Sequence, residues 1–307
     1  MKMENDKNTV LSVSNLSVSF KMYGKALDRL TLKVISNLNV SVREGEILAV
    51  AGSSGSGKSL LAHAILGILP RNAIVEGNIS YNGEPLTADR VKKLRGSEIA
   101  LVPQSVEYLD PLMKVGRQVS SDESAVEKAF ARYKLEKRVA RLFPFQLSGG
   151  MMRRVLCATA VVGNAKLIIA DEPTPGMSKE LASRAMKHFR DLADEGAAVM
   201  LITHDVDLAL GYADRIAVFY AGTTVETAPA SDFSAEENLR HPYTKALWRA
   251  MPQNGFRSTA GIQPYVGSLP DGCLFAPRCE IKTDECVYSA INPKTVRGGE
   301  VCCLYAT

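Results

Sequence analysis

The stretch GSSGSGKS, residues 52–59, decides the fold of this chain. It matches the phosphate-loop pattern G-x-x-x-x-G-K-[ST], in which glycines let backbone N–H groups turn toward phosphate oxygens. An apolar run from residue 47 predicts a strand before the loop, and SLLAHAILGIL, residues 59–69, has the apolar spacing of a buried helix. This strand–loop–helix order predicts a nucleoside triphosphate site. A flexible Gly/Ser loop is the alternative, and the presence of both Lys58 and Ser59 disfavours it.

The loop residues are candidates for direct contacts to the nucleotide. Lys58 would neutralise charge on the β- and γ-phosphates, and the Ser59 hydroxyl would ligate Mg²⁺. The start of the following helix adds a favourable dipole. The nucleotide-binding candidates in the loop are Gly52, Ser53, Ser54, Gly55, Ser56, Gly57, Lys58 and Ser59.

Two adjacent carboxylates close the apolar run LIIADE, residues 167–172. A P-loop NTPase needs a carboxylate on a neighbouring strand to hold Mg²⁺ through its water shell, and Asp171 stands at that position. Glu172 should point away from Asp171, where it could act on the attacking water as a general base. The alternative is that both acids cap the next helix. Because the chain also has a complete phosphate loop, the hydrolytic interpretation is favoured.

The remaining apolar pattern indicates an α/β domain. Residues 11–20 alternate with period 2 and predict a strand. The almost wholly apolar runs 165–171 and 197–205 predict buried parallel strands. The charged segment 109–147, which precedes both runs, has a helical pattern and predicts an inserted helical subdomain.

The composition and the apolar pattern of the chain change near Ala230. The segment RIAVFYAGTTVETA, residues 215–228, predicts a hairpin that ends the sheet. The sequence beyond it is irregular and rich in Pro, Gly and Cys, and five of the six cysteines lie between Cys273 and Cys303. We therefore expect a boundary near residue 230.

Bulk properties exclude several classes of protein. The 307 residues are enough for one large α/β domain with an appendage, and the net charge of +4 is too small to argue for a nucleic-acid partner. Residues 1–10 have no apolar core, so we expect no signal peptide, and no stretch reaches the ~18 apolar residues of a membrane span. We expect a cytosolic protein that reaches a membrane only through a partner. Cysteines in such a compartment argue against a disulfide framework.

Three further motifs carry a family resemblance. LSGGM at residues 147–151, Gln104 in LVPQS and His204 in LITHD, taken with the phosphate loop and the acidic pair, resemble the ATP-binding cassette (ABC) ATPases over about residues 12–228. The resemblance implies an α/β P-loop NTPase core with an antiparallel β subdomain, a helical subdomain and a Cys-containing C-terminal extension. The implied domains are a cassette at 1–230, with its helical subdomain at about 107–160, and an extension at 231–307.

The resemblance also assigns roles. His204 would contact the γ-phosphate beside catalytic Glu172, and Gln104 would join Ser59 and Asp171 around Mg²⁺. Phe20 is a candidate for stacking on adenine, with Tyr23 as the alternative, although an aromatic residue there fits a core position equally well. The signature residues that would close over ATP held by a partner cassette are Ser148, Gly149, Gly150 and Met151.

The sequence also resembles one subfamily, the dipeptide/oligopeptide/nickel importer ATPases. The similar stretches are YLDPLMKVGRQV after Gln104, HPYTKAL at 241–247, and the cysteine-rich tail. In that subfamily four tail cysteines can hold a [4Fe–4S] cluster, and here they would be Cys273, Cys279, Cys286 and Cys303, with Cys302 as the alternative to the last. Zinc and unliganded surface thiols stay open, because thiolates suit either metal. Cys157 lies in an apolar helical pattern and is expected in the core.

The sequence departs from the family pattern at two positions, and both departures bear on the kind of partner subunit. Ser178 stands where the family carries an aspartate that reaches across the dimer interface, and Met151 replaces the glutamine of the signature. A hydroxyl brings no charge, so communication between the two ATP sites should differ. The subfamily commonly pairs two different ATPases, and both departures fit a heterodimer with unequal sites.

The resemblance implies an ATP-hydrolysing subunit that powers import of peptides, nickel or metal chelates. Its implied partners are a second ABC ATPase, two transmembrane permease subunits and an extracytoplasmic substrate-binding protein, with no nucleic acid. It would lie on the cytoplasmic face of the membrane. The alternatives are a soluble ABC ATPase without a transport role and a regulatory cassette with weak hydrolysis.

Overall fold

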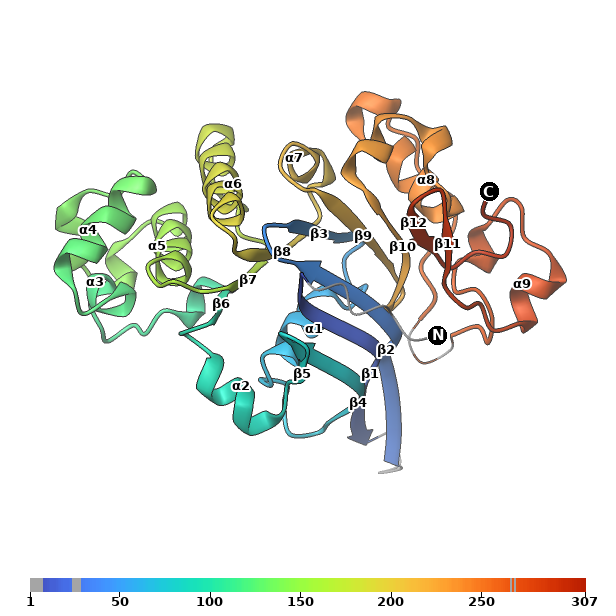
Figure 1. Ribbon diagram of the computed structural model, residues 1–307, viewed down its shortest axis with the longest axis horizontal. Coiled ribbons are helices and arrows are strands. Elements are labelled where there is room, and N and C mark those ends of the chain that lie inside the picture. The colour runs from blue at the N-terminus through green and yellow to red at the C-terminus, as the bar shows by residue number, and fades with distance from the viewer. Residues whose placement is uncertain (1–7, 24–28, 266, 268) are drawn as a thin grey trace.

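The chain folds around two sheets (Figure 1). The computed structural model describes residues 8–23, 29–265, 267 and 269–307, so residues 1–7, which carry most of the signal-peptide expectation, lie outside it. The smaller sheet is antiparallel with strand order β2-β1-β4-β5, as the resemblance implied. Its strands are β1 (Thr9–Tyr23), β2 (Arg29–Arg43), β4 (Ala73–Tyr81) and β5 (Glu84–Pro85).

The larger sheet has the order β11-β12-β10-β9-β3-β8-β7-β6, and its central strands are parallel. The two apolar runs expected as buried parallel strands are β7 and β8. Parallel strands place their carboxyl ends at one edge, where α/β proteins bind ligands. The strands are β3 (Ile47–Gly52), β6 (Ile99–Val102), β7 (Leu167–Asp171), β8 (Ala198–Thr203), β9 (Arg215–Tyr220), β10 (Thr223–Pro229), β11 (Lys294–Val296) and β12 (Gly299–Val301).

Strand β3 contributes to the cores on both faces of this sheet. Ile47 and Ala49 pack on the face covered by α6, α7 and the helical lobe, whereas Leu48 and Val50 pack on the face covered by α1 and the smaller sheet. This alternation is the period of 2 of a strand buried on both sides. Cys157 is fully buried on the first face, which confirms its core position, and burial raises the pKa of its thiol to about 12.

Helices surround the larger sheet, and α3, α4 and α5 form a lobe at the end opposite α8 and α9 (Figure 1). Within the described residues, no helix is both long enough and apolar enough to cross a membrane. The α-helices are α1 (Lys58–Ile65), α2 (Ala88–Leu94), α3 (Val115–Val119), α4 (Glu123–Arg132), α5 (Gly149–Val161), α6 (Lys179–Asp194), α7 (Val206–Leu210), α8 (Pro242–Arg249) and α9 (Asp284–Tyr288). The 3₁₀ helices are η1 (Val106–Tyr108), η2 (Lys137–Arg141), η3 (Pro144–Gln146), η4 (Ala230–Ser234), η5 (Glu236–Asn238), η6 (Pro252–Asn254) and η7 (Ala276–Arg278).

The β9–β10 hairpin forms as expected but does not end the sheet. Strand β12 pairs with β10, and β11 pairs with β12, so the last residues of the chain complete the edge. A buried ion pair supports this attachment: the Glu226 carboxylate of β10 accepts from the backbone N–H groups of Arg240 and His241 and pairs with the Arg240 guanidinium at 3.2 Å. The same guanidinium donates to the carbonyls of Val296 and Arg297. The C-terminal extension is therefore joined to the cassette by main-chain pairing and by a buried charge.

Candidate functional site

The phosphate loop joins the end of β3 to the start of α1, and two of its glycines are required by geometry. A Cβ on Gly52 would lie 2.3 Å from the carbonyl oxygen of Phe219 on the neighbouring strand. Gly57 has the left-handed φ of 96° that favours glycine, and it is the N-cap of α1. The loop is held from the other side as well, because Gly222 N–H donates to the Ser56 carbonyl. These contacts fix the loop as a turn that opens onto a helix N-terminus.

Lys58 is buried inside this turn. Its Nζ donates to the carbonyls of Gly52 and Ser53 at 2.8 and 2.9 Å. Burial lowers the pKa of Lys58, while the charges of Glu172 and Asp171 raise it. The ammonium group therefore lies in the centre of the loop, within the field of both acids, where a phosphate chain would be neutralised.

Asp171 ends β7 and is 3% exposed. Burial raises the pKa of Asp171, a hydrogen bond from the Ser59 hydroxyl lowers it, and the charge of Glu172 raises it. Its Oδ1 atom is buried without a hydrogen-bond partner in the described part of the chain. Mg²⁺ prefers carboxylate, hydroxyl and water oxygens, so Asp171 and Ser59 fit a magnesium site.

Glu172 and His204 form a direct contact that the sequence did not reveal. The two Glu172 carboxylate oxygens lie 2.9 and 2.8 Å from His204 Nδ1. Glu172 is buried and has a φ of 48°, a conformation that non-glycine residues adopt at a cost of about 1–3 kcal/mol. Its N–H donates to the Ile202 carbonyl of β8. The strained backbone thus holds the carboxylate facing the histidine that follows the next strand.

Gln104 lies just after β6 and is exposed, and its backbone is held by a residue that sequence reasoning missed. Arg153 of α5 donates to the carbonyl of Pro103 at 3.1 Å and to the carbonyl of Gln104. The only available signal was a basic residue two positions after LSGGM. Arg153 therefore links the segment that carries Gln104 to the helix that carries the signature.

The signature begins α5, a helix of 13 residues whose first turn is open. Ser148 is its N-cap and accepts from the Met151 N–H at 3.3 Å. A Cβ on Gly149 would meet no atom of the described residues within 4 Å, whereas one on Gly150 would lie 3.2 Å from the Gly176 carbonyl. Met151 is half-buried and packs against the hydrophobic core, which gives the replacement of glutamine a packing role. The helix start is accessible to a second molecule.

Ser178 has a local role at the start of α6. Its hydroxyl accepts from the Leu181 N–H at 3.4 Å, which makes it the N-cap of that helix. Ser178 itself is exposed. The Ser178 hydroxyl therefore caps α6 at the position where the resemblance predicted an aspartate.

The signature does not lie at the same nucleotide site as the phosphate loop. Strands β8, β7 and β6 separate β3 from the lobe that contains α5, as Figure 1 shows. The phosphate loop, Asp171, Glu172 and His204 gather at the carboxyl ends of β3, β7 and β8. One chain thus has the phosphate loop and the signature at two separate places.

Phe20 is half-buried on β1 and packs against the hydrophobic core between α1 and the smaller sheet. Its neighbours in register are Leu32 and Ala73. Tyr23 at the end of β1 is 72% exposed. The structure therefore gives Phe20 a packing role, and its contact with adenine stays a prediction.

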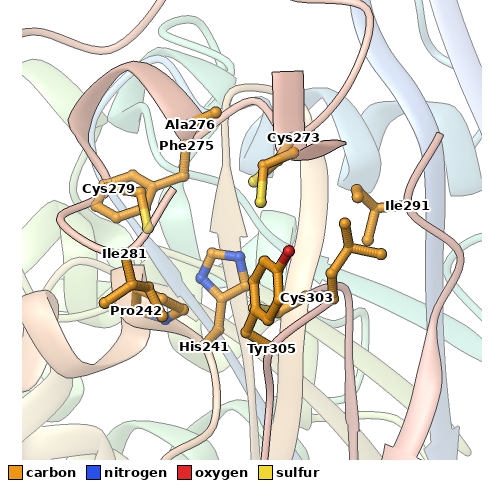
Figure 2. Close-up of a pocket in the computed structure, with 12 residues that line it drawn as sticks. His241, Pro242, Cys273, Phe275, Ala276, Cys279, Ile281, Ile291, Cys303 and Tyr305 are labelled. Carbon is orange, nitrogen blue, oxygen red and sulfur yellow. The ribbon is translucent and has the colours of Figure 1, made fainter. Parts of the chain in front are cut away.

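The C-terminal extension contains a second candidate site. Cys273, Cys279, Cys286 and Cys303 line one pocket, and Cys302 does not (Figure 2). All six cysteines are free. Burial raises the pKa of the Cys273, Cys279 and Cys303 thiols. Within the described ranges, no group of three or more His, Cys, Asp or Glu side chains has the spacing of a metal site. The pocket thus has the right ligand type and number, with sulfur atoms that must move closer together to bind a metal.

His241 lines the same pocket, and Figure 2 shows its imidazole pointing into the space between the cysteines. Its Nδ1 accepts from the Tyr243 N–H at 3.0 Å and caps α8. Burial lowers the pKa of His241 to about 3, although the Cys302 backbone opposes this shift. The Nε2 atom is buried without a partner in hydrogen-bond geometry among the described residues.

A sheet that ends at a phosphate loop, with an open helix start on a separate lobe, defines an ATPase of the ATP-binding cassette class. Comparison with known families agrees. The family model described as "ABC transporter" matches residues 35–175, and the model described as "Oligopeptide/dipeptide transporter, C-terminal region" matches residues 225–286. The chain belongs to the ATP-binding proteins of ABC transporters.

Individual relatives cover almost the whole chain. A putative peptide import ATP-binding protein of Brucella abortus is 35% identical over 91% of this chain and 89% of its own length. The oligopeptide transport ATP-binding protein OppD of Bacillus subtilis is 34% identical over 88% of this chain and 81% of its own length. The solved ATP-binding cassette MJ0796, in a dimeric post-hydrolysis state with ADP and Pi, has a TM-score of 0.64 at 26% identity and covers 72% of this chain and 98% of its own length.

Proposed function

We propose that this chain is the ATP-hydrolysing subunit of an importer of short peptides, attached to the cytoplasmic face of the membrane through two permease subunits. The observation that carries the proposal is the buried Glu172 carboxylate, held against His204 beside a complete phosphate loop. The match of residues 225–286 to the C-terminal region of oligopeptide/dipeptide transporters supports the substrate class, as do the printed functions of the relatives. Nickel or a metal chelate is the second candidate.

We also propose the division of the chain into a cassette at 1–230, with its helical subdomain at about 107–160, and an extension at 231–307. The proposed division is supported by the separate lobe of α3, α4 and α5. The extension adds β11 and β12 to the cassette sheet, so the two parts share one sheet.

In the proposed reaction, the loop N–H groups and Lys58 bind the triphosphate of ATP. Ser59, Asp171 and Gln104 would hold Mg²⁺, which would supply charge neutralisation to the triphosphate. Glu172 takes a proton from the attacking water, and His204 orients the γ-phosphate. Glu172 and His204 lie in hydrogen-bond contact, so the proposed general base is held beside the proposed γ-phosphate ligand.

We propose that the signature of each subunit completes the partner's nucleotide site. In this chain the partner-facing residues are Ser148, Gly149, Gly150 and Met151. Ser178 supports a heterodimer, since a hydroxyl that caps α6 brings no charge to the interface. ATP-driven closure of the pair, followed by hydrolysis, would alternate the access of the permease subunits, and an extracytoplasmic binding protein would deliver the peptide.

We expect the purified chain with Glu172→Gln to stay monomeric when ATP is added, because one of its interface positions lacks the family's aspartate. Size-exclusion chromatography with light scattering measures this directly. The control is Glu172→Gln/Ser178→Asp, which restores the charge and should increase the dimer fraction. A stable ATP-dependent homodimer of the single variant would contradict the heterodimer proposal.

A transport assay tests the substrate. In cells of the source organism that carry Glu172→Gln as the only copy, we expect uptake of a labelled tripeptide to fall to background while uptake of labelled nickel is unchanged. Loss of nickel uptake with normal peptide uptake would reverse the order of the two candidates. Normal uptake of both would remove the transport proposal.

We propose that Cys273, Cys279, Cys286 and Cys303 bind a [4Fe–4S] cluster. Their common pocket supports this, and so does the imidazole of His241, which points into the space between the cysteines and could donate from Nε2–H to a cluster sulfur. Bound iron would hold the cysteines as thiolates despite their raised pKa values. No step of ATP hydrolysis passes through this group.

After anaerobic purification we expect a brown protein with about four iron and four sulfide per chain. Cys279→Ser should remove most of the iron and the visible absorbance, whereas the matched change Cys302→Ser should keep both, because Cys302 does not line the pocket. A colourless protein with one zinc would indicate a zinc site. A protein without metal would show that the four cysteines are unliganded thiols, which would contradict the cluster proposal.

A further inference from the structure

The C-terminal extension reaches the phosphate loop. The Ser53 hydroxyl donates to the side-chain oxygen of Gln263 at 2.7 Å, although the two residues are 210 positions apart. The carbonyl of the same Ser53 accepts from Lys58 Nζ at 2.9 Å. Ser53 is therefore the residue at which the extension and the phosphate-binding lysine meet.

One arginine holds the segment that carries Gln263. Arg278 donates from Nε to the Ala260 carbonyl at 3.0 Å and from Nη2 to the Thr259 carbonyl at 3.1 Å. Gly261, with φ 81°, lies against the same side chain, since a Cβ there would be 3.3 Å from Arg278 Cγ. These contacts hold residues 259–263 along the Arg278 side chain, and we call these residues the strap.

Arg278 is itself anchored on the cassette. Its Nη1 lies 3.4 Å from the Tyr220 hydroxyl, and its guanidinium carbon lies 5.9 Å from the centre of the Tyr220 ring. Tyr220 ends β9, and the preceding Phe219 pairs with Gly52, the first residue of the phosphate loop. The contacts form a closed ring from the loop through β9, Arg278 and the strap back to Ser53.

From this ring we infer that Gln263 is a positioning residue of the nucleotide site, supplied by the C-terminal extension and held by Arg278. By fixing Ser53, it keeps the start of the phosphate loop in its binding conformation. A neutral carboxamide suits this place, because it accepts from Ser53 without adding negative charge near the triphosphate. The inference rests on the proposed ATPase function but does not require metal in the cysteine pocket.

Equilibrium binding of ATP without Mg²⁺ tests the role without turnover. We expect Gln263→Ala to weaken ATP binding about two- to tenfold, the range of one hydrogen bond. Gln253→Ala is the matched control: Gln253 is also a glutamine of the extension with an exposed 2.7 Å hydrogen bond, to Asp207, but it makes no contact with the phosphate loop among the described hydrogen bonds. Its affinity should equal that of the wild type.

Two further variants separate positioning from general structural support. Gln263→Glu still accepts from Ser53 but adds a charge, so it should bind ATP more weakly than Gln263→Ala at low salt and approach it at high salt. Arg278→Ala should weaken binding as Gln263→Ala does, and the double variant should be no weaker, because both act through one strap. Arg278→Lys provides the milder test if Arg278→Ala does not fold.

The outcomes are distinct. If the wild type does not bind ATP, the proposed function fails. If the wild type binds ATP and the Gln263→Ala and Gln253→Ala variants have equal affinity for ATP, the positioning role of Gln263 is overturned and the proposed function is not. Additive effects of Gln263→Ala and Arg278→Ala would also overturn it, because they would place the two residues in separate roles. Iron and thiol content measured on the same samples shows whether a change in the cysteine pocket caused the loss.

Discussion

Glu172→Gln is expected to lower the rate of ATP hydrolysis about 10²- to 10⁴-fold, the usual contribution of a positioned general base. Glutamine has the same shape but cannot accept the proton of the attacking water. The phosphate-binding contacts made by Lys58 and the loop are untouched, so the Kd for ATP should stay within about threefold. Phosphate release measured beside equilibrium ATP binding separates the two effects.

The control is Glu180→Gln, the same change at an exposed position in the first turn of α6. It should keep the wild-type rate. The assay uses the chain in complex with the proposed partner ATPase and permease subunits, in which both proposed half-sites would be complete. Turnover above a tenth of the wild-type rate in Glu172→Gln would remove Glu172 from the role of general base.

Glu226→Ala is expected to lower the free energy of unfolding by about 3–5 kcal/mol, the cost of breaking a buried ion pair. Glu226 and Arg240 are 1% and 4% exposed. Removing the carboxylate leaves the buried backbone N–H groups of Arg240 and His241 without their acceptor and takes one of its two carboxylate partners from the Arg240 guanidinium, which keeps Asp232 at 2.8 Å. The two unpaired N–H groups and the weakened pairing of the guanidinium then oppose docking of the whole extension.

The single tryptophan reports this directly. Trp248 lies in α8, and its indole donates to the Phe233 carbonyl, so its fluorescence follows the extension during urea unfolding. The control is Asp191→Ala, which breaks an exposed pair with Lys187 and should cost less than about 1 kcal/mol. A loss of 1 kcal/mol or less in Glu226→Ala would show that the extension does not depend on this pair.

The order of the main elements could be predicted from the sequence, and the edge of the sheet could not. Apolar runs before the phosphate loop and before the acidic pair correctly indicated β3 and β7. The hairpin β9–β10 was expected to close the sheet, yet β12 pairs beside it. The short strand Gly299–Val301 carries little pattern of its own, and it pairs with β10, whose Glu226 forms the buried ion pair with Arg240.

The sequence by itself determined the phosphate loop, the acidic pair and the signature, because each is a run of consecutive residues whose backbone geometry is local. Only the tertiary structure decided how they meet. Contacts between Glu172 and His204, between Arg153 and Gln104, and between Ser53 and Gln263 join residues 32, 49 and 210 positions apart. Such contacts depend on the order of strands in the sheet and on the packing of the extension, and no local pattern encodes either.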